Sequence, residues 1–133
     1  TALAASLIIG AFHTLWHLPM FFMEGQSQYE WVQEVGFLSA FMGYLVFVTA
    51  WAIQLTWVFN NTKGSVLLPA IVHGVGNMWI GGYFEIHART GMQGNYILTA
   101  VMAAVSIIIV VVAGPANLSR SRLRQTLGLQ SNQ

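Results

Sequence analysis

Residues 2–22, ALAASLIIGAFHTLWHLPMFF, are apolar over almost their whole length and decide the class of fold. About 20 consecutive apolar residues in a helix cross the hydrocarbon core of a bilayer, which is about 30 Å thick. Of the 133 residues in the chain, 56% are hydrophobic and 7% are charged, whereas soluble domains carry about 25% charged residues. We therefore expect a lipid bilayer around most of this chain, and the net charge of +1 gives no basis for binding nucleic acid.

Three further apolar segments follow along the chain, at about residues 36–59, 66–84 and 96–113. Each is close to the length that spans a membrane, and Gly114-Pro115 ends the last of them. The pattern predicts an all-α fold, a polytopic transmembrane bundle of about four spanning helices over residues 1–115, followed by a basic cytoplasmic tail at 116–133. Because Thr1 lies inside an apolar run, we expect this chain to be the C-terminal part of a longer protein. The N-terminal helices of that protein would then pack against the helices of this chain.

The basic residues predict an orientation, because Lys and Arg gather in cytoplasmic loops. Four of the five lie between the second and third segments or after the fourth: Lys63, Arg120, Arg122 and Arg124. The opposite side carries Arg89 and the four carboxylates, Glu24, Glu30, Glu34 and Glu85. The sequence therefore predicts a plasma-membrane protein with both ends of the chain in the cytoplasm. Glu24, Glu30 and Glu34 are interpreted as an interfacial surface.

Two pairs of polar residues lie inside the predicted spans, where such side chains are costly and usually face the bundle interior. His13 and His17 are four residues apart in the first span, and His73 and Asn77 are four apart in the third. Each pair therefore shares one helix face, and we expect both to face one buried cavity. The predicted span ends leave His17 and His73 offset in depth by about 10 Å at 1.5 Å per residue. Pro19 is expected to kink the helix or to end it early, which would move His17 inward.

The residue types in these pairs suit the hydrolysis of an amide. A neutral imidazole transfers protons near neutral pH, and imidazole and amide N–H groups stabilise an oxyanion. His17 is the candidate for proton transfer, His73 and Asn77 are the candidate oxyanion donors, and His13 is a further candidate without an assigned role. Such a site still needs a carboxylate or a metal to activate water. The chain has no Asp, and no Glu lies within a predicted span.

The same residues resemble two motifs of the CPBP family of intramembrane proteases. LWHLPMFF, at 15–22, is similar to the family's FxxxH region, and LLPAIVHGVGNMW, at 67–79, is similar to its HxxxN region. Position 13 holds His where the family pattern has Phe or another bulky residue. The family's EExxxR motif is absent, and its place in the family would lie before Thr1.

The resemblance implies an intramembrane endopeptidase in which a glutamate, missing from this chain, activates water with the help of His17. His73 and Asn77 would stabilise the oxyanion. The implied substrates are membrane-associated, CAAX-type or bacteriocin-like peptides and membrane proteins. No cofactor is required by the glutamate mechanism, although the family has also carried the label of metalloendopeptidase. By itself, this chain is expected to be inactive.

Two alternatives remain open from the sequence. The first is a non-catalytic membrane protein of the same fold, such as a bacteriocin self-immunity protein or a partner subunit. The second is a metal or haem protein, in which His13, His17 and His73 would hold Zn²⁺ with an open position or ligate a haem.

Overall fold

The computed structural model describes residues 1–119, with side chains for residues 1–77 and 90–119. Every element in this described part is a helix: α1 (Ala2–Trp16), the 3₁₀ helix η1 (Leu18–Phe22), α2 (Ser27–Val35), α3 (Phe37–Asn61), α4 (Leu67–Thr90) and α5 (Met92–Ala113). The predicted all-α fold is confirmed. Most of the predicted tail, with its three arginines, lies outside the described residues, as do the side chains of Glu85 and Arg89.

Among the described residues, three helical segments are long and apolar enough to cross a membrane: Ala2–Phe22, Phe37–Asn61 and Met92–Ala113. A shorter apolar stretch, Leu67–Asn77, begins α4, which continues to Thr90. The third predicted span therefore ends too early, because residues 85–90 continue the helix instead of forming a loop. The apolar helices make this chain an integral membrane protein.

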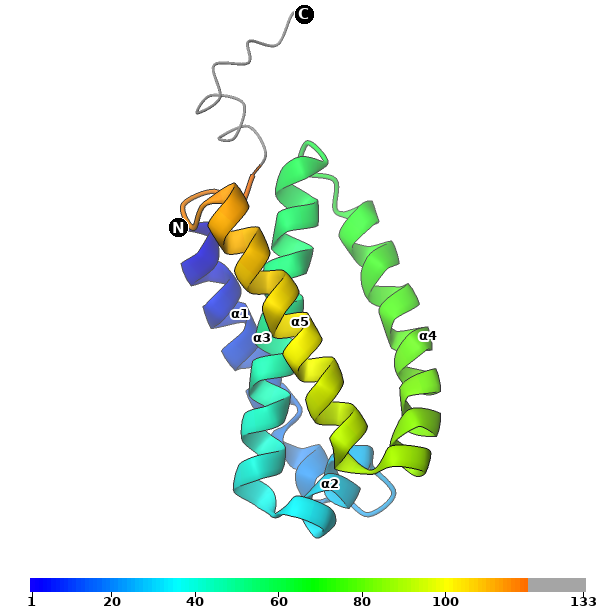
Figure 1. Ribbon diagram of the computed structural model, residues 1–133. Helices are drawn as coiled ribbons and strands as arrows, with labels where there is room; N and C mark the ends of the chain where they lie inside the picture. Colours follow the sequence, from blue (N-terminus) through cyan, green and yellow to red (C-terminus); the bar gives the residue numbers. More distant parts are fainter. Residues whose placement is uncertain (120–133) are drawn as a thin grey trace, which may run out of the picture.

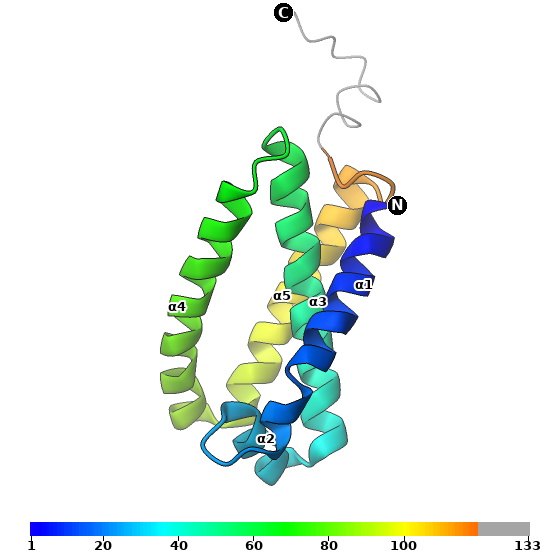
Figure 2. The same cartoon turned by 180° about the vertical axis from the view of Figure 1, so that it is seen from behind.

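The central helix of the bundle is α3, which packs against α1, α2, α4 and α5 (Figures 1 and 2). The start of α1 and the ends of α3 and α5 lie together. The Ala2 amide donates to the Ala116 carbonyl at 2.8 Å, and Asn60 Nδ2 donates to the Asn117 carbonyl at 2.7 Å. Lys63 and the chain after α5 are thus at the same end of the bundle, as predicted; that this end is cytoplasmic stays a prediction.

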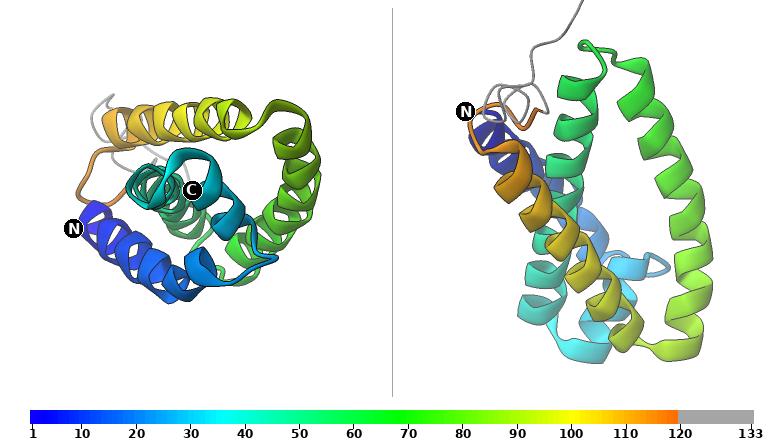
Figure 3. Two further views of the ribbon diagram at one scale, coloured as in Figure 1. Left: turned by 90° about the horizontal axis from the view of Figure 1, so that it is seen from below. Right: turned by 45° about the horizontal axis from the view of Figure 1, so that its top comes forward.

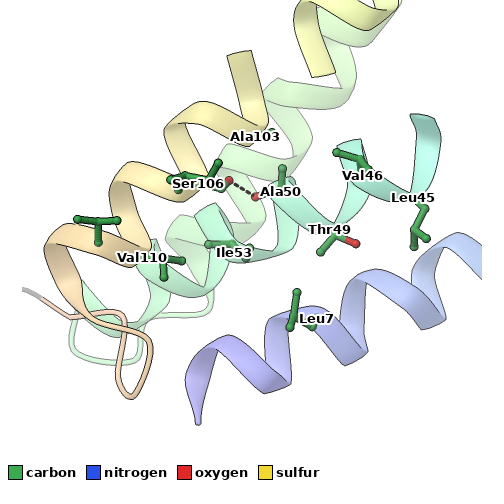
Figure 4. Close-up of a pocket in the computed structure, with 11 residues that line it drawn as sticks. Leu7, Leu45, Val46, Thr49, Ala50, Ile53, Ala103, Ser106 and Val110 are labelled. Carbon is green, nitrogen blue, oxygen red and sulfur yellow. Dashed lines mark hydrogen bonds between the residues drawn. The ribbon is translucent and has the colours of Figure 1, made fainter. Parts of the chain in front are cut away.

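Lipid offers no hydrogen-bond partners, so polar side chains within the bundle bond to groups on neighbouring helices. Gln54 Nε2 on α3 donates to the Met102 carbonyl at 3.1 Å and to Ser106 Oγ at 3.2 Å on α5. The Ser106 hydroxyl in turn donates to the Ala50 carbonyl at 2.9 Å (Figure 4). On the other side of α3, the hydroxyl of Ser6 donates to Thr56 Oγ1 at 2.8 Å. These bonds fix α1 and α5 against α3.

The close approach of α1 to α3 depends on Gly10. A Cβ at Gly10 would lie 2.6 Å from Thr49 Oγ1 and 2.7 Å from Thr49 Cα, and a backbone atom cannot rotate away. Gly10→Ala is therefore expected to lower the free energy of unfolding in detergent by about 1–3 kcal/mol, the usual cost of overpacking. Gly43→Ala on α3 is the matched control, since its nearest neighbour would be a Tyr96 ring carbon at 3.6 Å. Equal stability of the two variants would contradict the prediction.

The connection between α1 and α3 is more ordered than its polar sequence indicates. Residues 23–35 contain α2, which lies over the start of α3 inside the ring formed by α1, α4 and α5 (Figure 3). Trp31 is buried among Phe21, Ala40 and Met92, which joins η1, α2, α3 and α5 in one apolar cluster. Gly36, with φ of +81°, then turns the chain from α2 into α3.

The three glutamates lie at the surface of the bundle, as interpreted from the sequence, and one of them also makes a contact that was not expected. Glu24 and Glu30 are exposed. Glu34, also exposed to solvent, has a structural contact, since its Oε1 accepts from the Met92 amide at 2.8 Å. Because the first N–H groups of a helix lack partners within it, a carboxylate at that position stabilises the start of α5.

Candidate active site

The end of α1 brings His13 and His17 together. Proline lacks an N–H and disfavours a helical residue before it, so Pro19 ends α1 at Trp16 and lies in the first turn of η1. His17 caps the helix, and its ring folds back so that Nδ1 lies 3.0 Å from the His13 carbonyl oxygen. The two imidazoles stack with centroids 4.6 Å apart and planes 10° from parallel. The predicted shared face is confirmed.

His73 on α4 lies beside both α1 and α3. Its ring centroid is 6.3 Å from that of His13. On the other side, the Trp51 indole Nε1–H donates to His73 Nδ1 at 3.3 Å. His73 is thus held between a neighbour on α1 and a donor on α3.

A cavity of about 330 Å³ is lined by all four candidate residues, His13, His17, His73 and Asn77. The predicted convergence of the two pairs is therefore observed. This convergence is geometry alone, and the catalytic roles of His17, His73 and Asn77 remain predictions.

The predicted offset in depth between His17 and His73 persists within this cavity. His17 contacts the Tyr44 ring, with centroids 5.6 Å apart, whereas His73 bonds to Trp51, seven positions further along α3. Seven positions correspond to about 10 Å along a helix. Pro19 therefore ends α1 without removing the offset. The His13 ring lies between the other two imidazoles and contacts both of them.

Two walls of the cavity were not predicted from the sequence. Aromatic side chains from α3 and α2 form one wall, and polar side chains before and at the start of α2 form another: Trp31, Tyr44, Phe47, Trp51, Gln26, Ser27 and Gln28. A signal for part of this wall exists, since Tyr44, Val48 and Trp51 follow helical i, i+4, i+7 spacing. The polar wall has no such signal, because the fold of residues 23–35 places it.

A largely apolar groove of about 540 Å³ runs between α1, α3 and α4 and borders the same site. His13, Trp51 and His73 line both the groove and the cavity. A third hollow, of about 470 Å³, lies between α1, α3 and α5 and has an apolar lining with Thr49 and Ser106 (Figure 4). This third hollow contains none of the candidate residues, so chemistry is expected only on the α4 side of α3.

No carboxylate among the described side chains lines the cavity. Glu24 and Glu30 are exposed, and Glu34 contacts the start of α5.

The imidazoles are not arranged as a metal site within the described part of the chain, where no three His, Asp or Glu residues could share an ion. Stacked rings direct their nitrogens along parallel planes, whereas ligands of one ion converge on it. The Zn²⁺ or haem alternative for His13, His17 and His73 stays a prediction.

Among curated proteins, the chain is similar to the CAAX prenyl protease 2 of Methanococcus maripaludis, with 28% identity over 69 residues. The matched stretch is 52% of this chain, and the chain spans about a quarter of the length of that relative, 25%. No protein-family profile matches the chain, and no solved structure matches it. The similarity, together with the apolar helices, fits a membrane protein of the CPBP type.

Proposed function

We propose that this chain forms part of an intramembrane endopeptidase of the CPBP type. The observation that carries the proposal is the single cavity lined by His17 from α1 and by His73 and Asn77 from α4. The similarity to a CAAX prenyl protease supports the same activity.

Each residue has a defined part in the proposed hydrolysis. A glutamate from another segment of the protein accepts a proton from water, with His17 as its partner in proton transfer. The water oxygen attacks the carbonyl carbon of the scissile peptide bond, and His73 and Asn77 donate hydrogen bonds to the resulting oxyanion. The C–N bond then breaks, the leaving nitrogen takes up the proton, and the products are a carboxylate and an amine.

The substrate proposed is a membrane-associated peptide with an apolar portion. The groove between α1, α3 and α4 borders His13 and His73, and apart from these imidazoles and a few polar atoms its lining is apolar. An apolar helix or hydrocarbon substituent in this groove would place an adjoining peptide bond at the cavity. We propose the plasma membrane as the location, with both ends of the chain in the cytoplasm.

Hydrolysis of defined peptides by the full-length protein tests this function. The protein is reconstituted in phospholipid nanodiscs and incubated in H₂¹⁸O with a prenylated CAAX peptide, its unprenylated counterpart and an apolar helical peptide. Mass spectrometry is expected to show cleavage with one ¹⁸O in each new C-terminal carboxylate. Failure to cleave any of the peptides would contradict the proposal and favour a non-catalytic protein of this fold.

Removal of metal separates the glutamate mechanism from the Zn²⁺ alternative. Treatment with a strong chelator is expected to leave peptide cleavage unchanged, because the residues that line the cavity provide donors and a base but no converging ligand set. Activity after dialysis against chelator is measured together with the metal content of the protein. Loss of activity that Zn²⁺ restores, with stoichiometric metal lost in His13→Ala and His17→Ala, would instead establish a metal site.

A further inference from the structure

We propose that Trp51 is a positioning residue that sets the tautomer of His73, and that His17 is held in the opposite tautomer by the backbone of α1. The functional meaning of this arrangement rests on the proposed peptidase activity, whereas the tautomers themselves do not. Neither role can be read from the motifs, since one partner is on α3 and the other is a carbonyl group.

The hydrogen bond between Trp51 and His73 is compatible with only one tautomer of His73. An indole N–H is a donor only, and a neutral imidazole has one N–H and one acceptor nitrogen. Since Trp51 Nε1 donates to His73 Nδ1 at 3.3 Å, the Nδ1 atom accepts and the proton is on Nε2. His73 therefore keeps an Nε2–H donor, which is the group required to stabilise an oxyanion.

The hydrogen bond of His17 requires the opposite tautomer. A backbone carbonyl oxygen is an acceptor only. Because His17 Nδ1 lies 3.0 Å from the His13 carbonyl oxygen, Nδ1 carries the proton and Nε2 has a free lone pair. His17 can thus accept a proton, whereas His73 can donate a hydrogen bond, and the two imidazoles of one cavity have different functions while both are neutral.

Gly76 makes the Trp51 contact possible. A Cβ at Gly76 would overlap the six-membered ring of the Trp51 indole, with one ring carbon at 2.6 Å. Any side chain at position 76 would therefore move the indole away from α4 and from His73. Gly74, in the same turn of α4, would meet nothing within 4 Å of an added Cβ. The two glycines of HGVGN thus provide matched positions for substitution. Gly76 contacts Trp51, and Gly74 faces open space.

Nuclear magnetic resonance of the full-length protein, ¹⁵N-labelled at His and Trp, tests the inference directly. We expect an unprotonated Nδ1 at His73 with a scalar coupling across the hydrogen bond to the Trp51 indole nitrogen. At His17 we expect a protonated Nδ1 and an unprotonated Nε2. Signals are assigned by their loss in His17→Gln and His73→Gln, and the coupling should vanish in Trp51→Phe and Gly76→Ala but persist in Trp57→Phe and Gly74→Ala.

Kinetics connect the tautomer to the activity. Trp51→Phe and Gly76→Ala are expected to lower kcat by about 10–100-fold with little change in KM, the range typical when the partner that orients a metal-bound histidine is lost. A protonated Nδ1 at His73, no coupling to Trp51, or full kcat in both variants would overturn the inference. A protein that shows the predicted tautomers but cleaves no peptide would refute the proposed function alone.

Discussion

Asn77→Ala is expected to lower kcat for peptide hydrolysis by about 10²–10³-fold while KM changes little. The reason is that an oxyanion donor acts mainly in the transition state, where removal of one such donor has an effect of this size. Asn77 lines the cavity one helical turn beyond His73, so its amide can share the oxyanion with the His73 imidazole. The measurement is single-turnover cleavage by the full-length protein in nanodiscs.

Two further variants separate this role from a general effect on folding. Asn77→Asp keeps the size of the side chain but removes its N–H donors, and we expect the same loss of kcat. Asn61→Ala removes an amide at the end of α3, where it donates to the Trp57 and Leu118 carbonyls and lines neither cavity nor groove. Unchanged cleavage in Asn77→Ala, or equal loss in Asn61→Ala, would exclude Asn77 as an oxyanion donor.

His17→Ala is expected to lower kcat by about 10²–10⁴-fold, the usual contribution of a positioned proton-transfer group. His13→Phe should keep most of the activity, although position 13 stacks directly on His17. The part of His13 that sets the tautomer of His17 is its carbonyl group, which phenylalanine retains, and an aromatic ring can still stack. The family pattern also accepts a bulky residue at this position.

The paired histidine variants distinguish catalysis from packing within one helix. Both are compared for kcat, for helix content and for elution from a sizing column. Loss of activity in His13→Phe as large as that in His17→Ala would assign His13 a chemical role through its imidazole. Full activity in His17→Ala would remove His17 from the mechanism.

The helices and the two polar pairs were predictable because their signals are local. A run of about 20 apolar residues, an i, i+4 pair and a proline each act over a few residues of chain, so α1, α3 and α5 and the shared face of His13 and His17 follow from the sequence. The offset between His17 and His73 follows from the constant rise per residue of a helix, whereas the expectation that Pro19 would remove it was wrong.

The contacts that complete the site depend on residues far apart in the chain. The bond from Glu34 to the start of α5 joins residues 58 positions apart, and the bond from Trp51 to His73 joins residues 22 positions apart. Local periodicity carries no information on such pairs, because they exist only after the helices have packed. The sequence by itself determined that this is a helical membrane protein in which His13 and His17 share one helix face and His73 and Asn77 share another. Only the tertiary structure placed Trp51 beside His73, because that contact requires α3 and α4 to meet at the bare backbone of Gly76.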